Sequence, residues 1–153
     1  MPNSQAMCTS FKEEILTATH NFGTAPTRGT SGADTFKGAL YLTTATLGAG
    51  TTVYSATGEV TGTNYSPGGV TVTNATPPTT SGTTAYWTPS ASITYTNVTL
   101  ATAFDAVLIY NSTQSNKAVS VHTFGSQTVT AGTFTLTMPS NTTTTALIRL
   151  ATT

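Results

Sequence analysis

The segment from Phe104 to Phe124 constrains the fold more than any other part of this sequence. Residues 107–110 form a short, continuous apolar run, residues 111–117 are polar, and residues 118–124 alternate between apolar and polar side chains. An apolar run, a polar turn and an alternating run together predict a β-hairpin whose first strand is buried on both faces. Because this is the most hydrophobic part of the chain, we expect the hairpin at the centre of the sheet.

Further strands are predicted on both sides of the hairpin. They are expected at residues 34–42, 70–73, 92–100, 132–138 and 146–151, with turns at 66–69, 75–82 and 125–130. Strands that recur about every ten residues, joined by Gly- and Pro-rich turns, are typical of antiparallel sandwiches and barrels. The sequence therefore predicts an all-β fold: an antiparallel β-sandwich or barrel-like domain with one short N-terminal helix.

The length of 153 residues fits one domain with a substantial core. Residues 1–9 are polar and are expected to form a flexible arm, or an arm ordered only by a partner. Residues 10–153 are expected to form the single β-rich domain.

The helix is predicted at about residues 10–20. Ser10 and Glu13 have the S-x-x-E spacing of a capping box, and Phe11, Ile15 and Leu16 share one face. A helix this short is not stable alone. We therefore expect it to cover a sheet face or an open end of the domain, or to anchor the chain to a neighbouring subunit.

The composition is poor in charge and rich in threonine. Charged residues make up 7% of the sequence, against ~25% in a typical soluble domain, and threonine fills about a quarter of the positions. The net charge is zero and no basic patch is present, so nucleic-acid binding is not expected. No apolar run reaches membrane length and no signal-peptide pattern is seen, so we expect no membrane contact. Charged side chains normally prevent strand edges of different molecules from pairing, so the low charge content favours a protein that functions in an assembly.

Few side chains are available for catalysis. The two histidines and the single cysteine lack the spacing of metal ligands, and no nucleotide or hydrolase motif occurs. We therefore expect a non-enzyme without catalytic residues, metal or cofactor. His20 is expected to bond the last-turn carbonyls of the helix, and His122 to lie at a surface or interface. Asp105 is expected to bond backbone amides at a turn, or to pair with Lys117 or Arg149.

Several stretches resemble a known family. They are residues 8–22 (CTSFKEEILTATHNF), 34–41 (DTFKGALY), 59–65 (EVTGTNY), 67–70 (PGGV), 108–113 (LIYNST), 116–119 (NKAV) and 124–125 (FG). Together they are similar to small Thr/Gly-rich virion proteins of tailed bacteriophages, and the resemblance spans most of residues 8–153. Its motifs are structural rather than catalytic.

This resemblance, together with the composition, implies a capsid decoration (cement) protein. Such a protein would be made in the host cytoplasm, bind the major capsid protein on the outer surface of the phage head, and form a homo-oligomer, with a trimer favoured. The candidate interface residues are Phe11, Ile15, Leu16, Phe22, Tyr86 and Trp87.

Two other functions remain open. One is a tail component, such as a tail tube, adaptor, baseplate or fibre-associated subunit. The other is a carbohydrate-binding module, in which Trp87, Tyr86 and Tyr65 would form an exposed aromatic platform. Against the platform stands the alternative that Trp87 and Tyr86 close one end of the sandwich.

Overall fold

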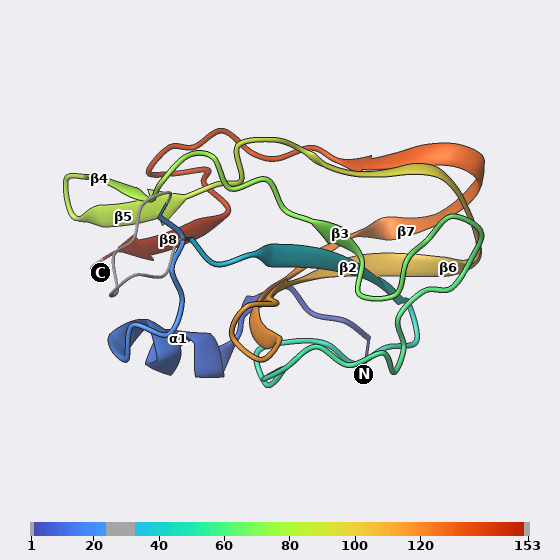
Figure 1. Cartoon of the computed structure of the whole chain (residues 1–153), viewed down its shortest axis with the longest axis horizontal. Helices are drawn as coiled ribbons and strands as arrows, with labels where there is room; N and C mark the ends of the chain where they lie inside the picture. The colour runs from blue at the N-terminus through green and yellow to red at the C-terminus, as the bar shows by residue number, and fades with distance from the viewer. Residues whose placement is uncertain (1, 24–32, 152–153) are drawn as a thin grey trace.

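The computed structural model describes residues 2–23 and 33–151, and it confirms the predicted all-β class with one short helix near the N-terminus (Figure 1). The elements in chain order are β1 (Ala6–Met7), α1 (Thr9–Leu16), β2 (Phe36–Leu42), β3 (Val70–Thr71), β4 (Thr79–Ser81), β5 (Thr84–Trp87), β6 (Ile93–Asn111), β7 (Lys117–Leu136) and β8 (Ile148–Ala151). They form two antiparallel sheets, with the orders β1-β7-β6-β2-β3 and β4-β5-β8.

The predicted central hairpin is confirmed by β6 and β7, which pair antiparallel on either side of the polar turn. From Phe104 to Tyr110 almost every residue of β6 is buried, as expected for a strand covered on both faces. Both strands are longer than predicted. The segment expected as a separate strand at residues 92–100 is the first half of β6, and the turn expected at 125–130 is wrong, because Gln127 pairs with Phe104 inside the ribbon.

The β6–β7 ribbon bends back over the first sheet. Its pairing register shifts repeatedly between Tyr95 and Ala106, and Figure 1 shows β7 turning at one end of the molecule and returning along the upper margin. The returning half covers the sheet: Tyr95 Oη donates to the carbonyl of Gly38 in β2 at 2.8 Å, and the rings of Phe104 and Phe134 meet edge to face at 5.0 Å. The core lies between these two layers.

Helix α1 differs from its prediction at both ends. It begins at Thr9 after Cys8, without a side-chain cap, so the Ser10–Glu13 capping box does not form. It ends at Leu16 rather than near residue 20, because Ala18 takes a left-handed conformation (φ 54°) and turns the chain.

The packed face of α1 also differs in part. Phe11 and Glu14 are buried and Ile15 is half-buried, whereas Leu16 is 87% exposed. Leu16 lies two residues after Glu14, so it points away from the face that Glu14 turns inward. The predicted face therefore holds for Phe11 and Ile15 and fails for Leu16.

The N-terminal segment packs against β7 and the end of β2 instead of extending from the domain as an arm. Ala6 and Met7 pair with Val121 and Ser120 of β7. The Asn3 amide nitrogen donates to the carbonyl of Leu42 at 3.0 Å and to Asp105 Oδ1 at 2.7 Å. The prediction that Asp105 pairs with Lys117 or Arg149 or with turn amides is thus replaced by this contact with Asn3.

Candidate functional site

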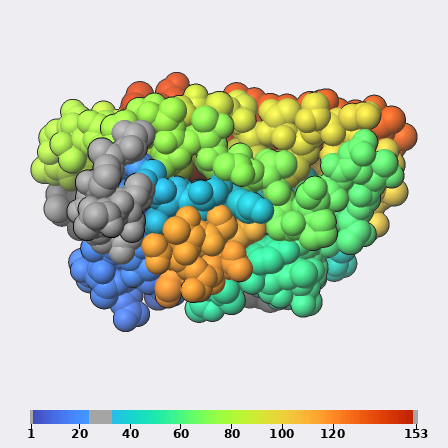
Figure 2. All heavy atoms as spheres, viewed as in Figure 1, coloured from blue at the N-terminus to red at the C-terminus, as the bar shows by residue number. Residues whose placement is uncertain are grey.

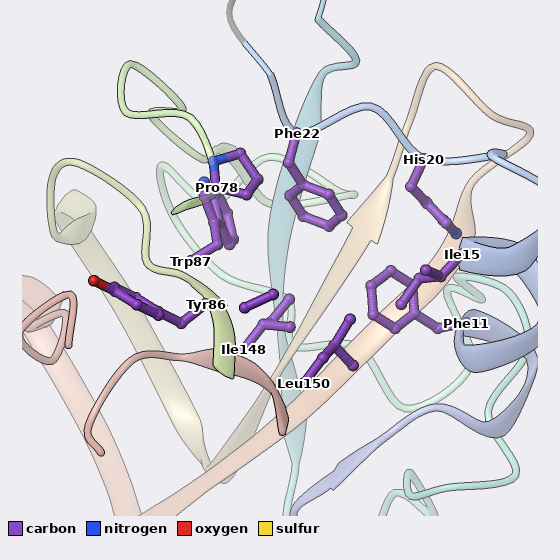
Figure 3. A pocket seen from close by; sticks show the side chains of 10 residues that line it. Phe11, Ile15, His20, Phe22, Pro78, Tyr86, Trp87, Ile148 and Leu150 are labelled. Atoms are coloured by element: carbon purple, nitrogen blue, oxygen red, sulfur yellow. The ribbon is translucent and has the colours of Figure 1, made fainter. Parts of the chain in front are cut away.

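Five of the six candidate interface residues gather around one apolar pocket. It lies between α1 and the second sheet, has a volume of about 140 Å³, and is lined by Phe11, Ile15, His20, Phe22, Pro78, Ala85, Tyr86, Trp87, Ile148 and Leu150 (Figure 3). The sixth candidate, Leu16, follows Ile15 on the same helix but does not line the pocket. None of these lining residues carries a carboxylate, a thiol, an ammonium or a guanidinium group.

Stacked aromatic rings form one wall of this pocket. Phe22 stacks on Phe36 of β2, with ring centroids 4.3 Å apart and an angle of 13° between the ring planes. The ring centroids of Phe22 and Trp87 are 4.7 Å apart. Phe11 from α1 meets the His20 ring at 4.9 Å. Because these rings come from α1, the segment after it, β2 and β5, the pocket depends on tertiary packing and not on a local motif.

The aromatic platform expected for a carbohydrate-binding module does not form. Trp87 is 2% exposed, and its indole nitrogen donates to Asn74 Oδ1 at 2.9 Å and to the carbonyl of Thr76 at 3.1 Å. Tyr65 is 9% exposed and donates to Glu59. Both rings are core residues, so the alternative in which Trp87 closes part of the sandwich describes the structure.

A polar network lies directly behind His20. Glu14 on α1 accepts from His20 Nε2 at 2.7 Å and from Lys117 Nζ at 2.6 Å. On the other side of the ring, His20 Nδ1 lies 3.0 Å from the side-chain nitrogen of Asn111, which also donates to Asp34 Oδ2 at 2.7 Å. The network joins α1, the segment after it, the segment before β2 and the two ends of the hairpin turn.

The hydrogen bonds of Asn111 fix the tautomer of His20. Asn111 Oδ1 accepts from the backbone nitrogens of Thr113 and Gln114, so the amide nitrogen must face His20. An amide N–H can only donate, so His20 Nδ1 accepts and its proton sits on Nε2, aimed at Glu14. The predicted contact of His20 with the last-turn carbonyls is therefore wrong, because the helix ends earlier and the ring reaches the Glu14 side chain.

The surroundings shift the pKa values of both partners downwards. Burial lowers the pKa of His20, although the hydrogen bond and charge of Glu14 act the other way. For Glu14, burial raises the pKa, but the hydrogen bonds from Lys117 and His20 outweigh it and lower the pKa. At neutral pH the pair is a neutral imidazole donating to a carboxylate.

Figure 2 shows the hairpin turn, in orange, on the surface between the blue N-terminal segment and the teal loop. The turn is held on both sides. Lys117 reaches Glu14 on α1, and Asn116 O accepts from the backbone nitrogen of Tyr54 at 2.9 Å. These contacts fix the position of the hairpin turn against α1 and against the segment around Tyr54.

A second buried network surrounds Glu59 and was not predicted from the sequence. Its carboxylate accepts from Tyr54 Oη at 2.6 Å, from Tyr65 Oη at 2.7 Å and from the backbone nitrogen of Gly68 at 2.7 Å. Burial and the hydrogen bond to Glu59 raise the pKa of Tyr65. The network fastens residues 53–69 onto the first sheet, since Tyr65 Oη also accepts from Leu40 N and Tyr110 Oη donates to Gly68 O.

The two remaining reactive side chains, Cys8 and His122, both have pKa values shifted by burial. Cys8 is fully buried, and burial raises the pKa of its thiol to about 11, so it stays protonated at neutral pH. Burial lowers the pKa of His122 to about 4, and its Nε2 lies 2.9 Å from Ser120 Oγ. Within residues 2–23 and 33–151, no three His, Cys, Asp or Glu side chains are grouped to hold a metal ion. No helix in these ranges is both long and apolar enough to cross a membrane.

Comparison of the chain with protein-family models, with curated proteins and with solved structures finds no match. The resemblance to phage virion proteins therefore stays a prediction from the sequence.

Proposed function

We propose that this chain is a structural protein of a tailed-bacteriophage virion, and specifically a decoration protein that binds the major capsid protein on the head surface. The observation that carries the proposal is the apolar pocket beside α1, whose lining includes Phe11, Ile15, Phe22, Tyr86 and Trp87. Its shape and chemistry suit an apolar side chain of a partner protein. The sequence resemblance supplies the identity of that partner.

Exposed apolar side chains close to this pocket support a docking role. Leu16 on α1 is 87% exposed and Leu150 on β8, at the pocket rim, is 41% exposed. Burying one such leucine against a partner contributes about 1.5–3 kcal/mol to the free energy of binding. A contact of this size, repeated over every site of a capsid lattice, adds up to substantial stabilisation of the shell.

The charge content favours attachment that is insensitive to salt. Only 7% of the residues are charged and the net charge is zero, so a partner would be held by apolar and threonine-rich contacts. Such contacts are not screened by ions. Decorated heads are therefore expected to keep the protein in 0.5 M to 1 M NaCl, a range in which the Debye length falls to ~3 Å.

Copy number per particle tests the proposal. Purified virions would be resolved by electrophoresis and stained quantitatively against the major capsid protein. A simple lattice ratio to the major capsid protein, such as one-to-one, supports a head decoration protein. Absence from the particle would overturn the virion assignment altogether.

Binding to isolated heads tests the role of the pocket. Leu150→Asp leaves the core untouched because Leu150, which lines the pocket, is 41% exposed, and the substitution is expected to weaken the affinity for undecorated heads, measured by co-sedimentation, by tenfold or more, given about 1.4 kcal/mol per factor of ten. Val53→Asp is the matched control, since Val53 is 47% exposed and does not line the pocket. Equal binding by both variants would remove the pocket region from the interface.

A tail component is the second candidate, and one observation favours it. The second half of β7 has a strand on one side only among the described residues, and ring or tube subunits use such edges to pair with neighbours. A few to several dozen copies per particle, instead of a lattice ratio, would assign the chain to the neck, tail or fibres.

A further inference from the structure

The second half of β7, residues 129–136, is an open strand edge. Its partners Ile93, Tyr95 and Leu100 all belong to β6. On the other side of β7, β1 pairs only with Ser120 and Val121 in the first half of the strand. In the described parts of the chain no strand lies beside residues 129–136 on that side. An edge strand turns alternate backbone N–H and C=O groups outwards, where another strand can bond them.

This edge lacks the charged residues and prolines with which soluble proteins protect an open strand. The sequence has no charged residue between Lys117 and Arg149, and no proline between Lys117 and Met138. Most other outer strands are short: β1 and β3 have two residues each, β4 has three and β8 has four. Among the residues that the structure describes, the first half of β6 also lacks a neighbouring strand on its outer side, but Thr63 bridges Thr99 there. Lysine, proline, shortness and β-bulges are the usual defences against edge pairing. This edge has neither lysine nor proline, and its one bulge, where Ala131 has a φ of 44°, lies near the start, so residues 132–136 form a regular open edge.

The core is also incompletely covered on this side. Phe124, Phe134 and Leu136 on β7, and Met138 just after it, are only partly buried, unlike the apolar residues of β6. Beneath them an apolar cavity of about 130 Å³ opens between the two halves of β7; its lining includes Phe124, Leu136, Met138 and Leu147. An unpaired edge and a half-covered apolar seam occur together at one side of the sandwich.

We propose that a second copy of this chain covers this side, with residues 129–136 of the two copies pairing antiparallel about a twofold axis. The edge is self-complementary: exposed Thr133 and Thr135 lie on one face, and half-buried Phe134 and Leu136 on the other. Antiparallel pairing places threonine beside threonine and apolar beside apolar side chains. Two uncharged edges of a chain with zero net charge meet without repulsion.

This pairing is independent of the proposed function, since it holds for a head or a tail protein and does not use the pocket beside α1. It differs from the trimer that the sequence resemblance implies. When a strand edge pairs with the same edge of a copy, the interface is closed after two chains.

The molar mass in solution tests the proposal. Light scattering after size exclusion is expected to give twice the 15.7 kDa of one chain. The double variant Thr133→Lys/Thr135→Lys, which places charges on the edge, is expected to give the mass of one chain. The double variant Thr94→Lys/Thr96→Lys is the control: it adds the same charges to exposed positions of the same layer, on β6, and is expected to remain dimeric. A monomeric or trimeric wild type, or a dimer that survives the edge lysines, would overturn the proposal.

Cross-linking gives an independent measurement if the lysine variants fail to fold. Directly opposed residues of antiparallel strands have Cα atoms about 4.5–5.5 Å apart, within the range of a disulfide. A twofold axis places only one residue of the strand directly opposite its own copy, so single cysteines are introduced in turn at each of residues 129–136, and at least one variant is expected to give a covalent dimer on mild oxidation. Thr96→Cys on β6 is expected to stay monomeric under denaturing electrophoresis, and the native Cys8 is fully buried. Failure at every position from 129 to 136 would contradict the proposal.

Discussion

Lys117 Nζ lies 2.6 Å from Glu14 Oε1, and this contact ties the first residue of β7 to helix α1 across 103 residues of sequence. The Glu14 carboxylate is mostly buried and also accepts from His20, whereas the Lys117 side chain is 39% exposed. The helix, which has no side-chain cap, is therefore held in place by the tip of the central hairpin.

Removing the Lys117 ammonium tests how strongly this tie holds the helix. Lys117→Met keeps most of the aliphatic chain but leaves Glu14 with His20 alone, and is expected to lower the free energy of unfolding by about 1 kcal/mol, a value limited by the solvent exposure of the lysine. Urea unfolding followed by tryptophan fluorescence measures the change. Lys12→Met, at an exposed position of the same helix, is the control and should change stability little. Equal losses in the two variants would mean that the ion pair is unimportant.

Acid is expected to destabilise the fold through its histidines. Burial lowers the pKa of both His20 and His122 below the unfolded value of 6.5. A lowered folded pKa means that the neutral form is favoured in the native state, so this stability is complete above pH 6.5 and is lost as pH falls below it. For His20 the reason is geometric as well, because a proton on Nδ1 would face the donating amide of Asn111.

Urea midpoints at pH 7.5 and pH 5 in each variant separate the two contributions. His122→Asn is expected to reduce the loss of stability between these pH values, and the double variant His20→Gln/His122→Asn to reduce it further. Glu14, whose pKa is also lowered, adds its own loss only as pH falls below its usual 4.5. An unchanged loss in the double variant would show that neither histidine is responsible.

Sequence patterns predicted the parts of the fold that depend on local periodicity. The 104–124 hairpin follows from an apolar run and an alternating run in adjacent segments. The prediction of a turn at residues 125–130 was wrong. Gly125 and Ser126 are typical turn residues, but the pairing of Gln127 with Phe104 continues the β6–β7 ribbon through them. Pairing with a distant strand overrides local turn preference.

The sequence predicted which residues belong to the candidate site better than it predicted how they are arranged. Phe11, Ile15 and Phe22 were chosen as apolar residues near the N-terminus, and they do meet Tyr86 and Trp87 around one pocket. The Glu59 network was missed because its partners come from a loop without regular structure. The only sequence signal was a carboxylate five residues after one tyrosine and six before another, which is too common a spacing to indicate a contact.

The Glu59 network is expected to be important for stability. Tyr65→Phe removes the buried hydroxyl that donates to Glu59 and accepts from Leu40 N, so Leu40 N is left unsatisfied and Glu59 keeps two of its three hydrogen bonds. An unsatisfied buried group costs about 1–3 kcal/mol, and a hydrogen bond to a charged group contributes about 1.5–3 kcal/mol, so the free energy of unfolding should fall by ~2 kcal/mol or more. Tyr86→Phe is the control, because Tyr86 is half-buried at the pocket and belongs to neither polar network. Similar unfolding midpoints for the two variants would contradict a stabilising role.

Gly69 is expected to tolerate no side chain. Its φ of 72° is in the left-handed region, and a Cβ atom there would overlap the carbonyl group of Gly38 in β2. Gly82 has a similar φ of 57° but open space around the added atom. Gly82→Ala should therefore cost only the backbone preference, about 1–2 kcal/mol, whereas Gly69→Ala must also separate residues 69–71 from β2. We expect Gly69→Ala to lower the thermal midpoint several times more than Gly82→Ala, or to prevent folding. Equal shifts in the two variants would show that the close approach of Gly69 to Gly38 does not constrain the fold.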